Sequence, residues 1–366
     1  MKIYSCRTGD SVRSLCEKFK ISPSRLLALN SLQNSRSLTP GLSLLIPEFK
    51  VNRPEIELGM EIPPYLPQSS FEAYSENLSF CCPLSCKLSG DELLTRPAGD
   101  SALSQKLCFK GAVPLLGISN LSSSSYSSEL LYKILSSIES RDRFIQKILN
   151  FVSEFSCLGV YLELSGIPPF SENFCCRFIE ELSEALHNRG LYFISALFYE
   201  TGLKALLKAS QKCCDRLIFP AYDERHIQSP PGYLCSLDEL DKKLNDIIKL
   251  IDPEKILLAL SDYALCWPAD ENPGREAGII TNSCARNLAV SCKAHINASD
   301  SGSYFDYRDF TGREQLIYFE DFLSLSKKFS LAESKKLAGI YIKRPSSDVS
   351  GLLGFLNAEY GFKKYI

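Results

Sequence analysis

Eight short runs of apolar and β-branched residues recur through most of the chain, and longer amphipathic segments separate them. In one such segment Phe144, Ile148 and Val152 recur at helical spacing. Strands that alternate with helices predict an α/β fold, and eight of them predict a (β/α)8 barrel of the TIM type, although periodicity alone leaves a doubly wound sheet open. The runs lie near 55–63, 78–84, 113–119, 158–165, 191–198, 215–222, 255–263 and 337–344.

The N-terminal part of the chain shows a shorter pattern. After an apolar start, residues 9–11 form a turn signal with side-chain oxygens that can cap a helix, and residues 11–19 have helical spacing. A Ser-Pro pair at 22–23 predicts a second capped helix, which ends near Asn30.

A strand completes this small unit. Leu42, Leu44 and Ile46 alternate along the chain and predict a strand with one buried face. The unit is therefore strand, helix, helix, strand. We expect one small domain over 1–48 and, after a short linker, a large barrel domain over 51–366.

Charge and hydropathy exclude several classes of partner. The 366 residues carry 41 basic and 43 acidic side chains, a formal net charge of -2, so no field of the whole molecule would concentrate nucleic acid. The first residues turn polar too soon for a signal peptide, and no run approaches the ~18 apolar residues of a membrane span. We expect a soluble protein made in the cytoplasm.

The chain has 15 cysteines and three histidines. Several cysteines are adjacent pairs, such as Cys81-Cys82, and none has the two-residue spacing of a zinc knuckle, so we expect no metal and no cofactor. The simplest interpretation is small buried hydrophobic residues in a reducing compartment. The alternative is cross-linking between molecules of an assembled layer.

The segment from Tyr4 to Pro47 resembles the LysM domain along its whole length. It contains Gly-Asp-Ser-Val at the first turn, a phenylalanine before Ile-Ser, Leu-x-x-Leu-Asn in the second helix, and Leu-x-Pro-Gly before the last strand. The resemblance implies a shallow groove for the N-acetyl groups of peptidoglycan or chitin. Its two sides would be formed by Gly9, Asp10 and Ser11 and by Asn30, Leu32 and Asn34. Alternatively, Gly9 and Asp10 serve only the turn and cap, and Asn30 only ends a helix.

Residues 51–366 resemble the glycoside hydrolase family 18 domain of YaaH/SleL-type spore germination proteins, which also carry N-terminal LysM domains. The resemblance rests on four segments in the correct order: RPEIELGMEI, VPLLGISNL, AYDERH with a following PPG, and EQLIYFEDFLSLSKK. It implies a barrel that acts on N-acetylglucosaminyl linkages.

The catalytic motif of that family is altered here. Its D-G-x-[DN]-x-D-x-E pattern aligns with LGVYLELS, which puts Leu158, Tyr161, Glu163 and Ser165 at the polar positions. The resemblance implies that the last of these should be the glutamate that acts as general acid, while the substrate's own N-acetyl group replaces an enzyme nucleophile. A serine hydroxyl is too weak an acid for that role near neutral pH.

Other carboxylates are candidates for a relocated acid. Glu163 lies about 6.6 Å deeper than position 165, at ~3.3 Å per strand residue, which is too far to serve the same bond. Glu200 and Asp262 follow or end predicted strands, where barrel enzymes place their chemistry. A carboxylate at such a position is more often an ordinary solvated side chain.

The sugar pocket is retained in part. Tyr222 and Asp223 match the residues that contact the N-acetyl group in the family, although Tyr222 could also merely pack the barrel mouth. The tryptophan that floors the sugar subsite on the last strand is replaced by Lys343 or a neighbour, so a stacking platform is missing.

We therefore expect a spore-associated or cell-wall-associated protein that binds peptidoglycan or a chitin-like polysaccharide through its LysM domain and carries an inactive barrel. One alternative is an active N-acetylglucosaminidase that acts on spore cortex. The other is a structural coat component that is cross-linked through its cysteines.

Overall fold

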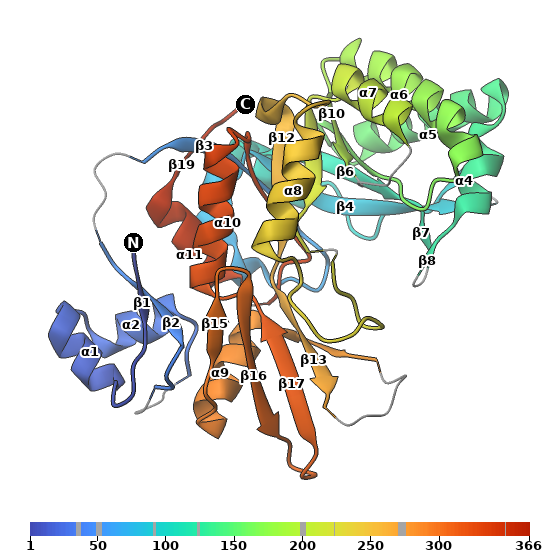
Figure 1. The fold of residues 1–366 in the computed structure, drawn as a ribbon. Helices are drawn as coiled ribbons and strands as arrows, with labels where there is room; N and C mark the ends of the chain where they lie inside the picture. Colours follow the sequence, from blue (N-terminus) through green and yellow to red (C-terminus); the bar gives the residue numbers. More distant parts are fainter. Residues whose placement is uncertain are drawn as a thin grey trace.

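The computed structural model places β1 (Lys2–Ser5), α1 (Val12–Phe19), α2 (Pro23–Leu29) and β2 (Ser43–Ile46) at the N-terminus in the predicted order (Figure 1). β1 and β2 pair antiparallel. The expected domain boundary falls on residues 49–52, which lie outside the described residues. The structure describes residues 1–33, 38–48, 53–90, 93–122, 125–197, 203–222, 224–269, 276–347 and 349–366.

Both helices of this module begin at the predicted caps. The Ser11 side chain accepts a hydrogen bond from the Ser14 backbone N–H, and the Ser14 hydroxyl in turn accepts from the Ser11 N–H. Ser22 caps α2 by accepting from the Arg25 N–H, with proline in the first turn. Local sequence therefore fixes where each helix starts.

Eight parallel strands close into a barrel, which confirms the (β/α)8 prediction. Pairing between the first two strands, with Gly59 opposite Phe80, completes the ring. An open doubly wound sheet keeps two unpaired edges, so closure excludes it. The strands are β3 (Glu55–Glu61), β4 (Phe80–Ser89), β6 (Val113–Ser119), β9 (Gly159–Glu163), β10 (Tyr192–Ala196), β11 (Arg216–Pro220), β12 (Ile256–Ser261) and β18 (Gly339–Lys343).

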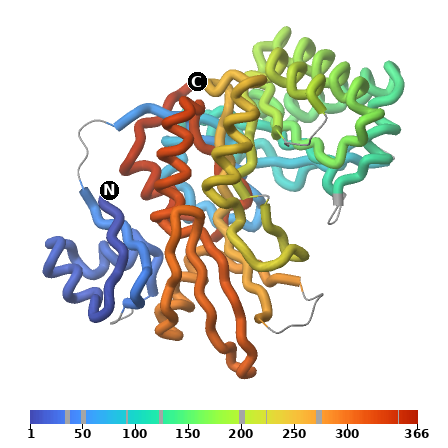
Figure 2. Tube along the Cα trace, in the orientation of Figure 1, coloured from blue at the N-terminus to red at the C-terminus, as the bar shows by residue number. Residues whose placement is uncertain are grey.

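Helices cover the outside of the ring (Figure 2). α5 buries Phe144, Ile148 and Val152 as their spacing predicts, and Phe144 stacks on Phe178 of α6 with ring centroids 5.2 Å apart. Within the described ranges, no helix is both long and apolar enough to cross a membrane. The barrel helices are α3 (Ala102–Phe109), α4 (Ser128–Leu135), α5 (Ile138–Glu154), α6 (Glu172–His187), α7 (Lys204–Cys213), α8 (Leu237–Ile247), α10 (Phe322–Ser334) and α11 (Ser350–Glu359).

A second sheet, which the sequence analysis did not predict, is inserted between β12 and β18. It projects from the barrel beside the N-terminal module (Figure 1). Its five antiparallel strands have the order β14-β13-β17-β16-β15, and α9 packs against it. We call this unit the insertion. Its elements are β13 (Tyr263–Pro268), β14 (Gly278–Thr281), α9 (Asn282–Cys292), β15 (Asn297–Ser299), β16 (Gly302–Arg308) and β17 (Glu314–Phe319).

The last residues of the chain cover the amino-terminal end of the barrel. After β19 (Gly361–Phe362), which pairs with β3, the Tyr365 ring stacks on Phe80 with centroids 5.3 Å apart. Its hydroxyl donates to Glu57 at 2.5 Å and accepts from Arg216 at 2.8 Å. Glu57 is 1% exposed, and Arg216 binds it through two further hydrogen bonds of 2.6 Å.

The N-terminal module packs tightly against the insertion. Leu32, Leu42 and Leu44 of the module share one apolar core with Ala289 and Ile296 of the insertion. β2 is consequently buried along its whole length, so the prediction of one buried face is wrong. Leu45, on the face expected to be exposed, is 0% exposed and packs into the barrel's own core.

Nine of the fifteen cysteines are buried, and all are free thiols. Burial suits the interpretation of cysteine as a small apolar residue. Cys284 and Cys292 of α9 are exposed, so they remain open to the alternative of cross-linking.

Candidate functional site

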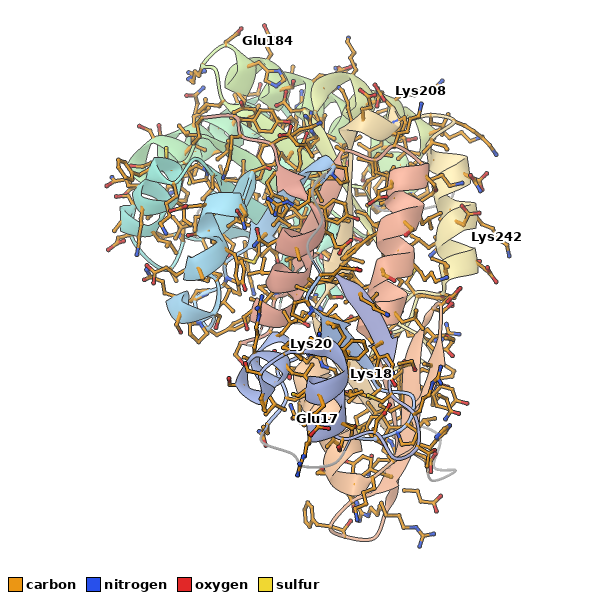
Figure 3. All side chains as sticks on the ribbon, turned by 90° about the vertical axis from the view of Figure 1, so that its left-hand side faces the viewer. Glu17, Lys18, Lys20, Glu184, Lys208 and Lys242 are labelled. Carbon is orange, nitrogen blue, oxygen red and sulfur yellow. The ribbon has the colours of Figure 1, made fainter. Side chains whose placement is uncertain are left out.

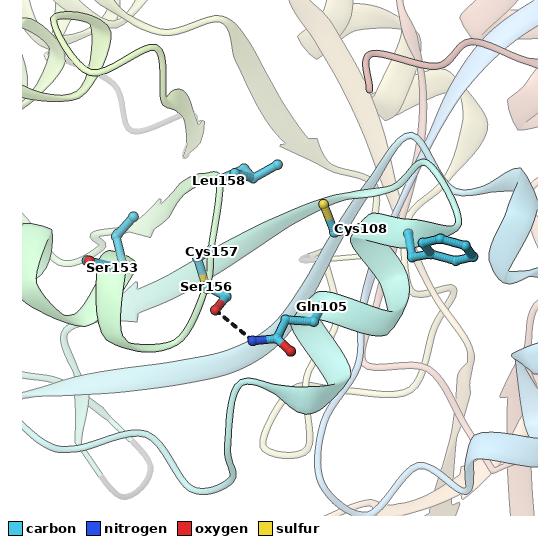
Figure 4. Close-up of a pocket in the computed structure, with 8 residues that line it drawn as sticks. Gln105, Cys108, Ser153, Ser156, Cys157 and Leu158 are labelled. Atoms are coloured by element: carbon cyan, nitrogen blue, oxygen red, sulfur yellow. Dashed lines mark hydrogen bonds between the residues drawn. The ribbon is translucent and has the colours of Figure 1, made fainter.

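The altered motif runs along β9, from one end of the barrel to the other. Leu158 precedes the strand at its amino end and lines an apolar hollow of about 410 Å³ together with Cys108 and Gln105 (Figure 4). Glu163 is the last residue of the strand, and Ser165 follows it at the mouth. The structure thus separates Leu158 from the other three motif positions.

Ser165 is held at the mouth by a neighbouring asparagine. The Asn120 side chain accepts from the Ser165 backbone N–H at 3.0 Å and donates to the Ser165 carbonyl at 2.8 Å. Asn120 follows β6, and both residues are less than 9% exposed. This two-point contact fixes the backbone at the position that the motif alignment predicts for a general acid.

A buried lysine occupies the centre of the mouth. Lys343, the last residue of β18, is 3% exposed. Its ammonium lies 2.5 Å from Glu61, 2.8 Å from Glu163 and 2.9 Å from the Tyr161 hydroxyl. We call these four residues the lysine cluster. Its carboxylates come from the carboxyl ends of β3 and β9, which the closed ring places on either side of the lysine.

The lysine cluster keeps Lys343 protonated. Burial opposes the charged form, but Tyr161, Glu61 and Glu163 outweigh it and hold the pKa of Lys343 well above its usual range. An acid that retains its proton so strongly cannot protonate a leaving group near neutral pH. Lys343 is therefore unsuited to the role of general acid.

Tyrosines surround the lysine cluster. Burial raises the pKa values of both Tyr161 and Tyr222, although the positive charge of Lys343 opposes the shift. Tyr126 of β8 (Ser125–Tyr126) donates to Glu163 at 3.4 Å. The structure thus brings together three of the predicted residues, Tyr161, Glu163 and Tyr222. Two others, Asp223 and Glu200, lie outside the described residues.

Asp262 belongs to a separate structural network. It is 8% exposed, accepts from the Asn282 side chain at 3.1 Å and also accepts from the Ser346 hydroxyl. The side-chain oxygen of Asn282 in turn accepts a hydrogen bond from the Glu320 backbone N–H at 3.1 Å. These contacts tie the insertion to the barrel, so Asp262 serves in joining the two.

One side of the predicted LysM groove is open. Gly9 has φ of +89°, and no atom lies within 4 Å of where its Cβ would be. The Asp10 carboxylate accepts from the Tyr4 hydroxyl and the Arg7 N–H, both at 2.8 Å, while Ser11 caps α1. Viewed from the side of the module, α1 carries Glu17 and Lys18 on its exposed surface (Figure 3).

The other side of the groove is built from buried residues. Asn30 is 0% exposed, and its side chain donates to the carbonyls of Leu26 and Leu45 and accepts from the Leu45 N–H. The side chain thereby joins α2 to β2, which is a structural role. Leu32 is 8% exposed and packs into the core shared with the insertion, and Asn34 lies outside the described residues.

Comparison with protein families fits both parts of this arrangement. The model described as "Glycosyl hydrolases family 18" matches residues 120–343, which is more than half of the chain, and the model described as "LysM domain" matches residues 4–47. The chain belongs to glycosyl hydrolase family 18. This family 18 member has the predicted order of domains, with LysM before the barrel.

Known relatives and solved structures match this chain over most of their length. The Cortical fragment-lytic enzyme of Bacillus anthracis is 21% identical, and the match covers 93% of this family 18 chain and 94% of the relative. The crystal structure of the Bacillus megaterium spore cortex-lytic enzyme SleL superposes with a TM-score of 0.89 at 18% identity and covers 100% and 99% of the two chains. A chitinase from Chromobacterium violaceum gives 0.71 at 17% identity over 81% and 99%. At these identities the superpositions show a shared fold.

Sequence reasoning missed the partner of Lys343. Glu61 was placed inside the first predicted strand without a role, and Tyr126 was not considered. A signal was present, because a lysine and a glutamate both sit at the carboxyl ends of barrel strands that are neighbours in a closed ring. Only the ring's closure makes those ends meet.

Proposed function

We propose that this protein binds N-acetylglucosamine-containing polysaccharide of the peptidoglycan or chitin type through its LysM module, and that its barrel does not hydrolyse the polymer. The observation that carries the proposal is the mouth of the barrel. Ser165, which the motif alignment puts at the general-acid position, lies at this mouth, and the lysine cluster fills the centre beside it.

In the described part of this mouth, the candidate carboxylates are already engaged in hydrogen bonds. Family 18 cleavage needs a carboxylic acid beside the leaving oxygen, while the substrate's N-acetyl group attacks the anomeric carbon. The Glu163 oxygens instead accept hydrogen bonds from Lys343 and Tyr126, and Asp262 is bound to Asn282 and Ser346. Both carboxylates thus already have hydrogen-bond donors as partners, and neither is positioned to protonate a sugar.

The place of action we propose is the spore. The supporting observation is that relatives matched over nearly their whole length carry the name Cortical fragment-lytic enzyme. For this chain we propose attachment to cortex or a related wall polymer without its cleavage.

Muropeptide analysis of purified spore cortex tests the proposal. We expect wild-type protein and Ser165→Ala to pellet with the polymer and to release no new reducing ends. Reducing ends released by the wild type would overturn the inactive barrel. A gain of release in Ser165→Glu alone would show that the remaining pocket still accepts the sugar.

A second candidate function is hydrolysis with a relocated acid, which the names of the lytic relatives favour. If the wild type does release reducing ends, Glu163→Gln, Glu200→Gln and Asp262→Asn identify the residue responsible, because each amide keeps the size of the side chain and removes the acid.

The third candidate is a cross-linked coat component, which the exposed thiols Cys284 and Cys292 favour. Gels run with and without reductant test it. Higher oligomers that disappear both with reductant and in Cys284→Ser with Cys292→Ser would support that role.

A further inference from the structure

We propose that the insertion competes with polysaccharide for the LysM groove, because the Asn287 side chain of α9 occupies a backbone site that an acetamido group would use. The proposal rests on the proposed polymer binding and deepens it. It concerns the side of the groove formed by residues 30–33.

Asn287 makes a two-point contact with this side of the groove. Its carbonyl oxygen accepts from the Gln33 backbone N–H at 2.7 Å, and its amide nitrogen donates to the Ser31 carbonyl at 2.9 Å. The same nitrogen donates to the Ser283 carbonyl of its own helix at 2.8 Å, which orients the side chain toward the module. The amide thus satisfies one donor and one acceptor of the module's backbone.

A carboxamide and an acetamido group both carry a carbonyl oxygen that accepts hydrogen bonds. The Gln33 N–H is therefore a site for the carbonyl oxygen of an N-acetyl group, and the Asn287 oxygen now fills it. This single N–H cannot serve both oxygens at once.

Further contacts hold the insertion against the LysM module. The Ile296 N–H donates to the Pro40 carbonyl at 3.1 Å, and the Thr39 hydroxyl donates to the Ala294 carbonyl. A Cβ at Gly41 would lie 2.1 Å from the Ile296 oxygen, so the two backbones approach as closely as glycine allows. The opposite side, at Gly9, stays open.

Competition of this kind lowers the apparent affinity of the module, because the polymer must displace the bound side chain before it can use the groove. Removal of the competitor should therefore strengthen binding. Asn287→Ala leaves the apolar contacts of α9 in place and deletes both hydrogen bonds to the module.

Titration calorimetry of the full chain with the hexamer of N-acetylglucosamine tests the inference. We expect Asn287→Ala to bind about fivefold or more tightly than the wild type, the change that removal of one or two hydrogen bonds produces. The matched control is Ser291→Ala, an exposed residue of the same helix whose hydroxyl donates within the helix, and its affinity should equal that of the wild type. The fully deacetylated hexamer should not discriminate between the proteins.

Each outcome decides between the two proposals. Equal or weaker binding by Asn287→Ala, with binding by the wild type, would overturn the competition and leave polymer binding intact. Absence of binding by both proteins would overturn polymer binding, and the competition with it. Hydrogen exchange at the Gln33 amide gives a second measurement, since exchange should quicken in Asn287→Ala and slow again with the hexamer. Unchanged exchange in the variant would contradict the contact itself.

Discussion

Most of the thiols of this protein lie inside it, and burial changes how they ionise. It raises the pKa values of Cys6, Cys86 and Cys175 to about 12 and that of Cys157 to about 11, from an ordinary value of 9.0. For Cys6 and Cys175 nearby acidic side chains add to the effect. The unfolded chain therefore loses these protons at lower pH than the folded protein does.

Stability should consequently fall in alkali. Because the folded pKa values are raised, the contribution of these thiols is fully present below about pH 9 and is lost as pH rises toward the folded values, by up to about 1.4 kcal/mol per pH unit for each thiol. Urea unfolding at a series of pH values measures this slope. Cys86→Ala should reduce it, while the exposed Cys284→Ala should not. A slope that is identical in both variants would refute the assignment to buried thiols.

The residues of the mouth show how far a sequence can predict a site. Ser165 at the general-acid position follows from alignment along a single strand, because neighbours on one strand keep a fixed spacing. The ion pairs of Lys343 do not follow from such an alignment, since Glu61 and Glu163 belong to other strands that are far apart in sequence. The order of strands in the sequence does not tell which strand ends lie close together in space. This part of the site could therefore be predicted only once the closed barrel was known.

At the scale of elements, the C-terminal tail covers the amino-terminal end of the barrel. Tyr365→Phe removes the hydroxyl shared by Glu57 and Arg216 but leaves those two bound to each other, so we expect a loss of about 1 kcal/mol. Tyr365→Ala also removes the ring stacked on Phe80 and should cost about 2 kcal/mol, less than a fully buried aromatic residue.

Urea unfolding checks both values for Tyr365. Affinity for the hexamer of N-acetylglucosamine serves as the control, because Tyr365 contacts Glu57, Arg216 and Phe80 of the barrel whereas the polymer is proposed to bind the LysM module. Equal stability of all three proteins would show that the tail is not part of the cooperative fold.

Strand and helix prediction succeeded where local pattern decides structure. All eight barrel strands and the four elements of the LysM module lie where periodicity and caps predict them. The insertion was not predicted. Its strands pair only with one another in a separate sheet, and the alternation of barrel strands and helices gives no sign of such a sheet. The prediction that only one face of β2 is buried failed for a related reason. Leu45, on the other face, is covered by barrel residues that are distant in sequence.

At the scale of the whole molecule, we expect the LysM module to unfold together with the rest of the chain. The apolar core that it shares with the insertion includes Ala285, Ala289, Ile296 and Phe305. Deletion of residues 1–50 would expose these side chains, so we expect the truncated protein to bind a hydrophobic dye more strongly and to melt at a lower temperature.

Dye fluorescence and calorimetry, compared with the full chain, measure this effect. Unchanged dye binding and an unchanged melting temperature would mean that the module is an independent appendage. Because deletion disturbs the barrel domain as well, point variants such as Asn287→Ala are the cleaner way to probe polymer binding.

Hydrogen bonds on both sides of β2 fix the module's distance from the barrel mouth. Thr39 and Pro40 are held on one side, and the Phe322 N–H donates to the Ser43 hydroxyl at 3.1 Å on the other. A fixed separation sets a minimum length for any polysaccharide that contacts both the module and the mouth. If the mouth also holds a sugar, we expect oligosaccharides long enough to reach both places to bind more tightly than shorter ones.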